Sequence, residues 1–329
     1  MPIKINYKKT DIKAYDIRTL PLRFFYSAVA HLYNDDARIS QRLYNFFPTY
    51  RSAFGEVQNQ LHRVCRRDTS YEVQGVHIEP TNICNLKCRH CSTQRIPNDK
   101  KGFMRLDLFK KILNENPQLR CIILTRNGEP FAHNQIFDMI RLASDKGIYI
   151  SLYSNGILLN DDNIPKIFES GLNEITFSME GVGEYYKYNR GKPYEAIEAV
   201  INSVLEQKKK RNSPLLVGIN ATVIEDSRHV IDVKETWENI VDYVIIEPLM
   251  GGNKERRVKP CRTLWRNLVI TWNGNVVPCC IDMAETLPLG DANKQSLREI
   301  FNGPKAQALR KRHLQAKFPK VCSLCYSYM

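Results

Sequence analysis

The most informative segment of the chain reads Glu79-Pro-Thr-Asn-Ile-Cys84-Asn-Leu-Lys-Cys88-Arg-His-Cys91. It follows an apolar run and spaces its cysteines four and three residues apart. Three thiolates on one loop bind three irons of a cubane cluster and leave the fourth iron open. The alternative is a zinc site whose fourth ligand is His90 or a remote residue. A pair of zinc-binding cysteines usually comes with a second pair of ligands, and the sequence near this segment has no such second pair.

The C-x₃-C-x₂-C pattern resembles the signature of the radical S-adenosylmethionine (SAM) superfamily. The resemblance implies a [4Fe–4S] cluster on Cys84, Cys88 and Cys91 whose open iron chelates SAM. It also implies reductive cleavage of SAM to a 5′-deoxyadenosyl radical, with a flavodoxin- or ferredoxin-type electron donor. The residue before the third cysteine is usually aromatic in this family and lies beside the cofactor, and here it is His90.

A strand pattern precedes this loop, and strand and helix patterns alternate along the chain after it. Strands are predicted at residues 73–79, 119–125, 148–153, 174–179, 215–224 and 243–248. Helices are predicted at residues 106–114, 135–144, 164–170 and 194–211. Such alternation predicts parallel βαβ units with right-handed crossovers.

The predicted fold is therefore of the α/β class. A partial (β/α)6 TIM-like barrel is expected at residues 73–250, after a helical N-terminal extension at residues 1–72. A small C-terminal α+β cluster-binding domain is expected at residues 251–329. In barrels of this kind, the chemistry gathers on the loops beyond the C-terminal ends of the strands.

Short polar motifs lie at those strand ends, and each resembles a SAM-binding element of the family. Asn127-Gly-Glu129-Pro130 resembles Gly-Gly-Glu-Pro and assigns Glu129 to the SAM amino group, as a carboxylate facing an ammonium. Ser154 follows the third strand, and Ser178 matches a polar position that faces the ribose. Arg190 resembles the arginine that pairs with the SAM carboxylate.

A second group of cysteines lies near the end of the chain: Cys261, Cys279, Cys280, Cys322 and Cys325. The sequence Trp272-Asn-Gly-Asn275 between two β-rich stretches predicts a hairpin. That hairpin would bring Cys261 and Cys279 together. Four thiolates from two segments suit a fully ligated [4Fe–4S] cluster or a Cys₄ zinc site.

This C-terminal pattern resembles the SPASM/twitch extension of radical SAM enzymes, which carries auxiliary iron–sulfur clusters. Because few cysteines lie beyond residue 250, the resemblance implies one auxiliary [4Fe–4S] cluster. Its expected ligands are Cys261, Cys279, Cys322 and Cys325. Cys280 is left over, although the adjacent pair leaves open which of the two cysteines is the ligand.

Charge and composition limit the kinds of partner that the chain can have. The chain has 43% hydrophobic residues and a formal net charge of +13, with basic runs at residues 208–211, 254–259 and 310–312. Such runs are mostly solvated faces, and the second interpretation is an anionic substrate. We expect no nucleic-acid partner. Because the sequence shows neither a signal segment nor a span-length apolar stretch, we expect a cytoplasmic protein without membrane contact.

These features favour an oxidoreductase that acts on a small molecule. The leading hypothesis is a dehydrogenase of a small polyol, amino sugar or nucleotide-linked metabolite, with the auxiliary cluster as electron acceptor. One alternative is an epimerase in which Cys280 donates a hydrogen atom. Another is a maturase of a ribosomal peptide. A rival from a different class is a zinc protein that binds nucleic acid through its basic runs.

Overall fold

The computed structural model describes residues 58–59, 61–249, 259–323 and 325 of the 329-residue chain. Most of the predicted N-terminal extension and the predicted domain boundary near residue 250 lie outside the described residues. Among the residues that are described, no helix is both long and apolar enough to cross a membrane.

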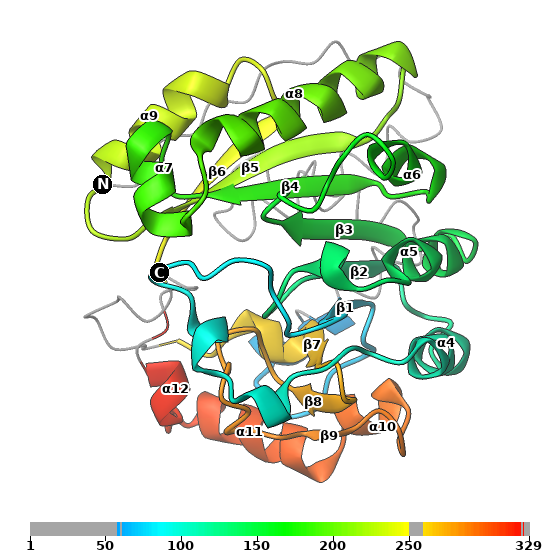
Figure 1. The fold of residues 1–329 in the computed structure, drawn as a ribbon. Coiled ribbons are helices and arrows are strands. Elements are labelled where there is room, and N and C mark those ends of the chain that lie inside the picture. Colours follow the sequence, from blue (N-terminus) through cyan, green and yellow to red (C-terminus); the bar gives the residue numbers. More distant parts are fainter. Residues whose placement is uncertain (1–57, 60, 250–258, 324, 326–329) are drawn as a thin grey trace, which may run out of the picture.

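Six parallel strands form the predicted barrel sheet and lie in the order of the sequence (Figure 1). They are β1 (Gly75–Ile78), β2 (Cys121–Leu124), β3 (Tyr149–Ser154), β4 (Glu174–Met179), β5 (Leu216–Val223) and β6 (Tyr243–Pro248). Each strand pairs in parallel with the next one along the chain. The prediction of an α/β fold with a parallel, partially closed sheet is confirmed.

Helices cover one face of this sheet (Figure 1). They are α4 (Leu106–Glu115), α5 (Ile136–Ser144), α6 (Ile164–Glu169), α7 (Gly183–Arg190), α8 (Tyr194–Lys210) and α9 (Arg228–Trp237). Alternation along β4 shows the two faces of the sheet: Ile175 and Phe177 are fully buried in the apolar core with the helices, while Glu174, Thr176 and Ser178 occupy the alternate positions. The polar face is therefore the inner one.

The C-terminal part continues the same sheet. The strands β7 (Asn267–Ile270), β8 (Asn275–Val277) and β9 (Gly290–Asp291) complete a nine-stranded sheet, in which β7 pairs in parallel with β1. β7 and β8 form the predicted antiparallel hairpin. The sequence predicted a separate small domain and did not foresee this continuous sheet, because the pairing of β7 with β1 joins segments that are remote along the chain.

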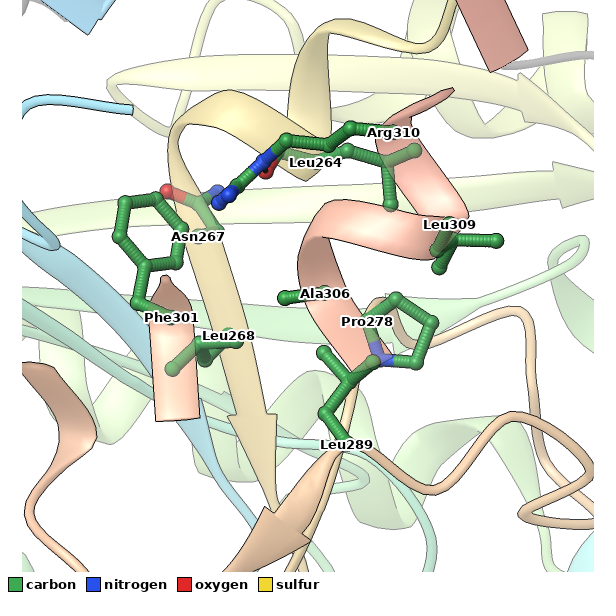
Figure 2. A pocket seen from close by; sticks show the side chains of 9 residues that line it. All are labelled: Leu264, Asn267, Leu268, Pro278, Leu289, Phe301, Ala306, Leu309 and Arg310. Carbon is green, nitrogen blue, oxygen red and sulfur yellow. Dashed lines mark hydrogen bonds between the residues drawn. The ribbon is translucent and has the colours of Figure 1, made fainter. Parts of the chain in front are cut away.

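Short helices complete the C-terminal part and the loops. They are α10 (Leu297–Phe301), α11 (Pro304–Leu314), α12 (Lys320–Ser323), η2 (Ser92–Arg95), η3 (Asn98–Lys100), η4 (Pro130–Ala132) and η5 (Arg262–Trp265). A cavity of about 10 Å³ lies between β7, η5, α10 and α11. Figure 2 shows the side chains that line it. A space of this size holds at most about one water molecule, so it is a packing gap rather than a substrate site.

Candidate SAM-binding and iron–sulfur site

The three cysteines of the predicted SAM cluster lie on the loop that follows β1. The backbone N–H of Leu86 donates to the Cys84 sulfur at 3.4 Å, and the Asn155 side chain donates to the same sulfur at 3.7 Å. Burial raises the pKa of the Cys88 thiol to about 11; the Arg190 guanidinium opposes the shift, and the other two thiols add to it. The three sulfurs therefore share one electrostatic environment.

Glu129 lies at the end of β2, directly beside this loop. Its carboxylate accepts hydrogen bonds from the Ser154 hydroxyl and the Asn155 N–H, both at 2.7 Å. Burial raises the pKa of Glu129, and these hydrogen bonds oppose the shift. The structure therefore brings together Glu129 and Ser154, two residues that the sequence assigned to SAM. Asn155, which touches both Glu129 and Cys84, was missed, because its motif predicts only a loop.

Gly128 makes the close approach of these two loops possible. Its φ is +76°, and a Cβ at this position would lie 2.3 Å from the Thr81 carbonyl oxygen. The neighbouring Glu129 N–H donates to the Ile83 carbonyl at 2.8 Å. Only glycine fits this backbone and this space, which explains why the Gly-Glu-Pro element has a glycine at position 128.

Arg190 is buried near the cysteines but already has a partner in the protein. Its Nε and Nη2 donate to the two carboxylate oxygens of Glu180 at 2.7 and 2.6 Å. Burial alone would raise the pKa of Glu180, but Arg190 and His90 outweigh burial and hold it at about 2. The sequence assigned Arg190 to the SAM carboxylate and did not foresee Glu180, which gave no signal beyond its place after the fourth strand.

His90 and Ser178 occupy different parts of this site. The His90 Nε2 lies 3.4 Å from a Glu180 oxygen, so His90 belongs to the Arg190 ion pair. Ser178 lies near the C-terminal end of β4, on the inner face and paired with Asn220 of β5. The roles of both residues toward SAM stay predictions.

The C-terminal thiols also gather. Burial raises the pKa of Cys279, and the thiols of Cys280 and Cys261 add to the rise. Burial raises the pKa of Cys280 to about 11, with smaller contributions from Glu247 and Cys325. Both members of the adjacent pair therefore lie among the predicted ligands, and Cys280 also lies near the end of β6.

Segments around the C-terminal thiols hold them in place. The Cys261 N–H donates to the Nδ1 of the buried His313 at 3.3 Å, which fixes Cys261 against α11. Cys322 lies on α12, and the Cys325 N–H donates to its carbonyl at 3.3 Å. Soft thiolate sets of this kind suit iron–sulfur clusters.

The donor groups of both sites are thiols, which suit iron–sulfur clusters. All ten cysteines are free thiols. Among the described residues, no three His, Cys, Asp or Glu side chains take up the geometry of a single-ion site. Thiolates that bind different irons of a cubane do not converge on one atom, so both cysteine groups remain suitable cluster ligands.

Several residues of the basic runs already have partners within the protein. Lys208 pairs with Asp242, Lys210 pairs with Glu206, and Arg211 pairs with Glu169. Arg310 is buried and donates to the Leu264 carbonyl at 2.7 Å. Most of the run at 254–259 lies outside the described residues. Within these two runs, Lys209, Lys311 and Arg312 are exposed to solvent, as expected of a solvated face.

Two family models match the chain. The Radical SAM superfamily model matches residues 78–232, and the SPASM model, an iron–sulfur cluster-binding domain, matches residues 261–326. The chain belongs to the radical SAM superfamily and carries a C-terminal SPASM domain. These domains imply SAM, a SAM-binding [4Fe–4S] cluster and auxiliary iron–sulfur chemistry, which confirms the predicted cofactors.

Curated relatives cover different lengths of the chain. The tungsten-containing aldehyde ferredoxin oxidoreductase cofactor-modifying protein of Pyrococcus furiosus is 35% identical over 108 residues, 32% of this chain and 30% of that protein. The PqqA peptide cyclase of Granulibacter bethesdensis is 20% identical over 300 residues, 76% of this chain and 79% of that protein. Other relatives are named AdoMet-dependent heme synthase. The first matches span only 30–46% of the relatives' own length.

Solved structures share the fold at low sequence identity. BtrN in complex with AdoMet and 2-DOIA has a TM-score of 0.57 at 16% identity, over 79% of this chain and 95% of BtrN. Streptococcus suis SuiB bound to the precursor peptide SuiA has a TM-score of 0.59 at 13% identity, over 79% of this chain and 72% of SuiB. At these identities, the likeness establishes the fold.

The comparisons change the weight of the predicted functions. The relatives' names include peptide cyclases, heme synthases and a cofactor-modifying protein. They give no support to the predicted dehydrogenase of a small polyol, and they fit the alternative of a peptide maturase better. What stands is an enzyme of the radical SAM superfamily.

Proposed function

We propose that this enzyme modifies a peptide by removing hydrogen from a side chain and forming a new bond at that carbon. The observation that carries the proposal is the extended match to a PqqA peptide cyclase, which spans 300 aligned residues and covers 76% of this chain and 79% of that protein. The fold shared with SuiB, solved with its precursor peptide, supports the same substrate class.

The residues of the barrel loops bind and orient the cofactor in this proposal. Cys84, Cys88 and Cys91 hold the SAM-binding cluster. Glu129 accepts a hydrogen bond from the SAM amino group, and the Ser154 hydroxyl keeps its carboxylate in place at 2.7 Å. Because three protein donors already hold Glu129 in a buried pocket, it needs little reorganisation when the cofactor binds.

Arg190 supplies the positive charge at the same end of the barrel. The bidentate contact with Glu180 fixes the plane of its guanidinium and leaves Nη1 for the SAM carboxylate. When bound, SAM and the two clusters supply the hydrogen-abstracting radical and an acceptor for the electron that the substrate loses. In the C-terminal group, Cys261, Cys322, Cys325 and one of the adjacent pair hold the auxiliary cluster.

The test is co-expression of the enzyme with short peptides encoded beside its gene, followed by mass spectrometry. A modified peptide is expected to lose the mass of two hydrogen atoms for each new bond. Cys88→Ala should abolish this loss, while Cys65→Ala, an exposed thiol outside both cysteine groups, should preserve it. If the reduced enzyme cleaves SAM but leaves every such peptide unchanged, the peptide proposal is wrong and a small-molecule substrate takes its place.

A further inference from the structure

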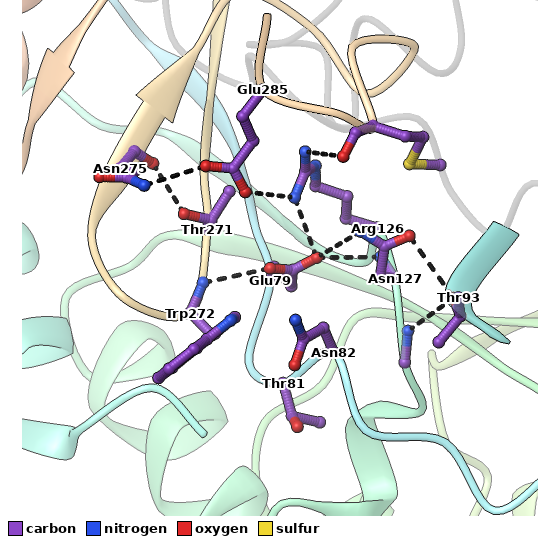
Figure 3. A network of polar contacts seen from close by, with 12 residues as sticks. Glu79, Thr81, Asn82, Thr93, Arg126, Asn127, Thr271, Trp272, Asn275 and Glu285 are labelled. Carbon is purple, nitrogen blue, oxygen red and sulfur yellow. Dashed lines mark hydrogen bonds and ion pairs between the residues drawn. The ribbon is translucent and has the colours of Figure 1, made fainter. Parts of the chain in front are cut away.

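A buried polar network joins the two cysteine-bearing loops, and Arg126 is at its centre (Figure 3). Arg126 follows β2, directly before the Asn127-Gly-Glu129 element. Its side chain and that of Glu79 are each only 1% exposed, and their charged groups lie 3.2 Å apart. A buried guanidinium requires this kind of compensation, because an unpaired charge in the protein interior is strongly unfavourable.

On one side, the network reaches the SAM-cluster loop. The Glu79 carboxylate accepts from the Asn127 N–H at 3.2 Å and from its side-chain amide at 3.0 Å. The Thr93 hydroxyl donates to the Asn127 side-chain oxygen at 3.4 Å. Thr93 is buried and lies two residues after Cys91. Glu79 thus connects Arg126 to the end of the first cysteine loop.

On the other side, the network reaches the turn after the adjacent cysteine pair. The Arg126 Nη2 donates to the backbone carbonyls of Asp282 at 3.0 Å and Met283 at 3.3 Å. Its Nη1 lies 3.5 Å from a Glu285 oxygen. Figure 3 shows Glu285 pointing toward the Arg126 guanidinium. Asp282 lies only two residues after Cys280.

The turn that receives Arg126 has a defined shape of its own. The Asp282 carboxylate accepts from the Thr286 N–H and hydroxyl at 2.9 and 2.7 Å and from the Leu287 N–H at 2.8 Å. Glu285 has a φ of +54°, in a region that residues other than glycine rarely adopt. The turn therefore holds its carbonyls in one orientation. The planar guanidinium, whose N–H donors have fixed directions, can bind carbonyls that are held in this way.

We propose that Arg126 is a positioning residue that holds the Cys279–Cys280 turn, and with it the auxiliary cluster, at a fixed place relative to the SAM-binding loop. The inference rests on the proposed function, because it takes Cys279 or Cys280 as a ligand of the auxiliary cluster. Neither the family signature nor the cysteine spacing assigns a role to this arginine.

Two substitutions separate its charge from its geometry. Arg126→Lys keeps the positive charge opposite Glu79, but one ammonium group cannot replace the fork that reaches Glu79 and two carbonyls at once. Arg126→Gln removes the charge as well. Arg120→Gln is the matched control, because Arg120 lies directly before β2, at its opposite end, and its guanidinium donates to the carbonyls of Pro117 and Leu119 in its own loop.

The experiment uses the reconstituted holoenzyme and two readouts. In hydrogen exchange, both Arg126 variants should exchange several-fold faster over residues 279–289, while Arg120→Gln matches the wild type. In redox titration followed by electron paramagnetic resonance, Arg126→Gln should move the potential of the auxiliary cluster to more negative values and leave the SAM-binding cluster unchanged. A purely structural arginine would lower stability without a shift confined to one cluster.

Wild-type exchange over residues 279–289 and wild-type potentials in both Arg126 variants would overturn the inference. If Arg126→Gln does not fold, Arg126→Lys carries the exchange test alone, because it keeps a counter-charge for Glu79. A wild-type protein that holds both clusters but cleaves no SAM would refute the proposed function and leave the exchange result on Arg126 intact, so the two failures are distinguishable.

Discussion

Gly128 shows how a single residue sets the geometry of the SAM site. Gly128→Ala would place a methyl group 2.3 Å from the Thr81 carbonyl on a backbone with φ of +76°. The left-handed backbone alone costs about 1–2 kcal/mol in a residue with a Cβ, and the clash adds to this. We expect a stability loss above about 2 kcal/mol together with weaker SAM binding, measured by denaturant unfolding and by equilibrium binding.

Gly147→Ala is the control for this substitution. Gly147 has a similar φ of +68°, but no other atom lies within 4 Å of the position of its Cβ. It should therefore show the backbone cost alone, with SAM binding unchanged. Equal losses in the two variants would mean that the contact with Thr81 does not matter.

Glu180 is the second residue whose role depends on a buried contact. Glu180→Gln keeps the shape of the side chain but leaves the Arg190 guanidinium without its counter-charge in the interior. Removing one partner of a buried ion pair typically costs about 3–5 kcal/mol. We expect a loss of that order in chemical denaturation. Glu184→Gln is the control: Glu184 lies on α7, the helix that carries Arg190, and its carboxylate is 89% exposed, so the change should leave stability unchanged.

At the scale of residues, the sequence predicted that the cysteine loop follows the first strand and that the Glu129 element follows the second, because both are local patterns; their ligand roles stay predictions. It did not predict Glu180, Asn155 or Arg126. Asn155 and Arg126 gain their importance from partners that are distant along the chain, as when Asn155 reaches Cys84 across 71 positions, and Glu180 gains it from a charge pair with Arg190 that no motif marks. No local spacing contains that information.

Helix α7 is the element on which the cysteine loop rests. The Arg89 N–H, between Cys88 and Cys91, donates to the Asn189 carbonyl of α7 at 3.0 Å. The Arg89 guanidinium lies 4.2 Å from the centre of the Tyr188 ring. The helix also carries Arg190. A change in α7 should therefore disturb the SAM-binding cluster before it disturbs the auxiliary cluster.

Lys187→Pro tests this dependence. Proline in a helix interior removes a backbone hydrogen bond and costs about 3 kcal/mol. Iron analysis of the folded variant should show selective loss of the SAM-binding cluster. Lys234→Pro is the control: it lies in the interior of α9, where Lys234 pairs with Glu238, and it should cost similar stability and keep both clusters. Retention of both clusters in the two variants would contradict the role of α7.

The elements that the sequence predicted are those with strong periodicity. The strand at residues 174–179 has the predicted bounds, and the helix predicted at 194–211 ends only one residue earlier in the structure. Helix α7 was missed, because its eight residues are mostly polar or aromatic and show no apolar stripe. The pairing of β7 with β1 was missed for a different reason, since strand pairing depends on tertiary structure.

At the scale of the molecule, one nine-stranded sheet carries both cysteine groups. The SAM-cluster loop follows β1. Among the C-terminal thiols, Cys261 precedes β7, and the adjacent pair Cys279 and Cys280 follows β8. The direct pairing of β1 with β7 therefore joins the strand before the SAM-cluster loop to the hairpin between Cys261 and Cys279. The order of the two domains was predictable from the cysteines, whereas this shared sheet required the structure.

The central claim is that the chain is a radical SAM enzyme whose first cysteine loop binds the SAM-cleaving cluster. The most direct measurement is the release of 5′-deoxyadenosine from SAM by the anaerobically reconstituted and chemically reduced protein. The wild type should release it, and a variant with Cys84, Cys88 and Cys91 all changed to Ala should release none while it keeps the iron of the auxiliary cluster. A wild-type protein with its full complement of iron that releases no 5′-deoxyadenosine would contradict the account.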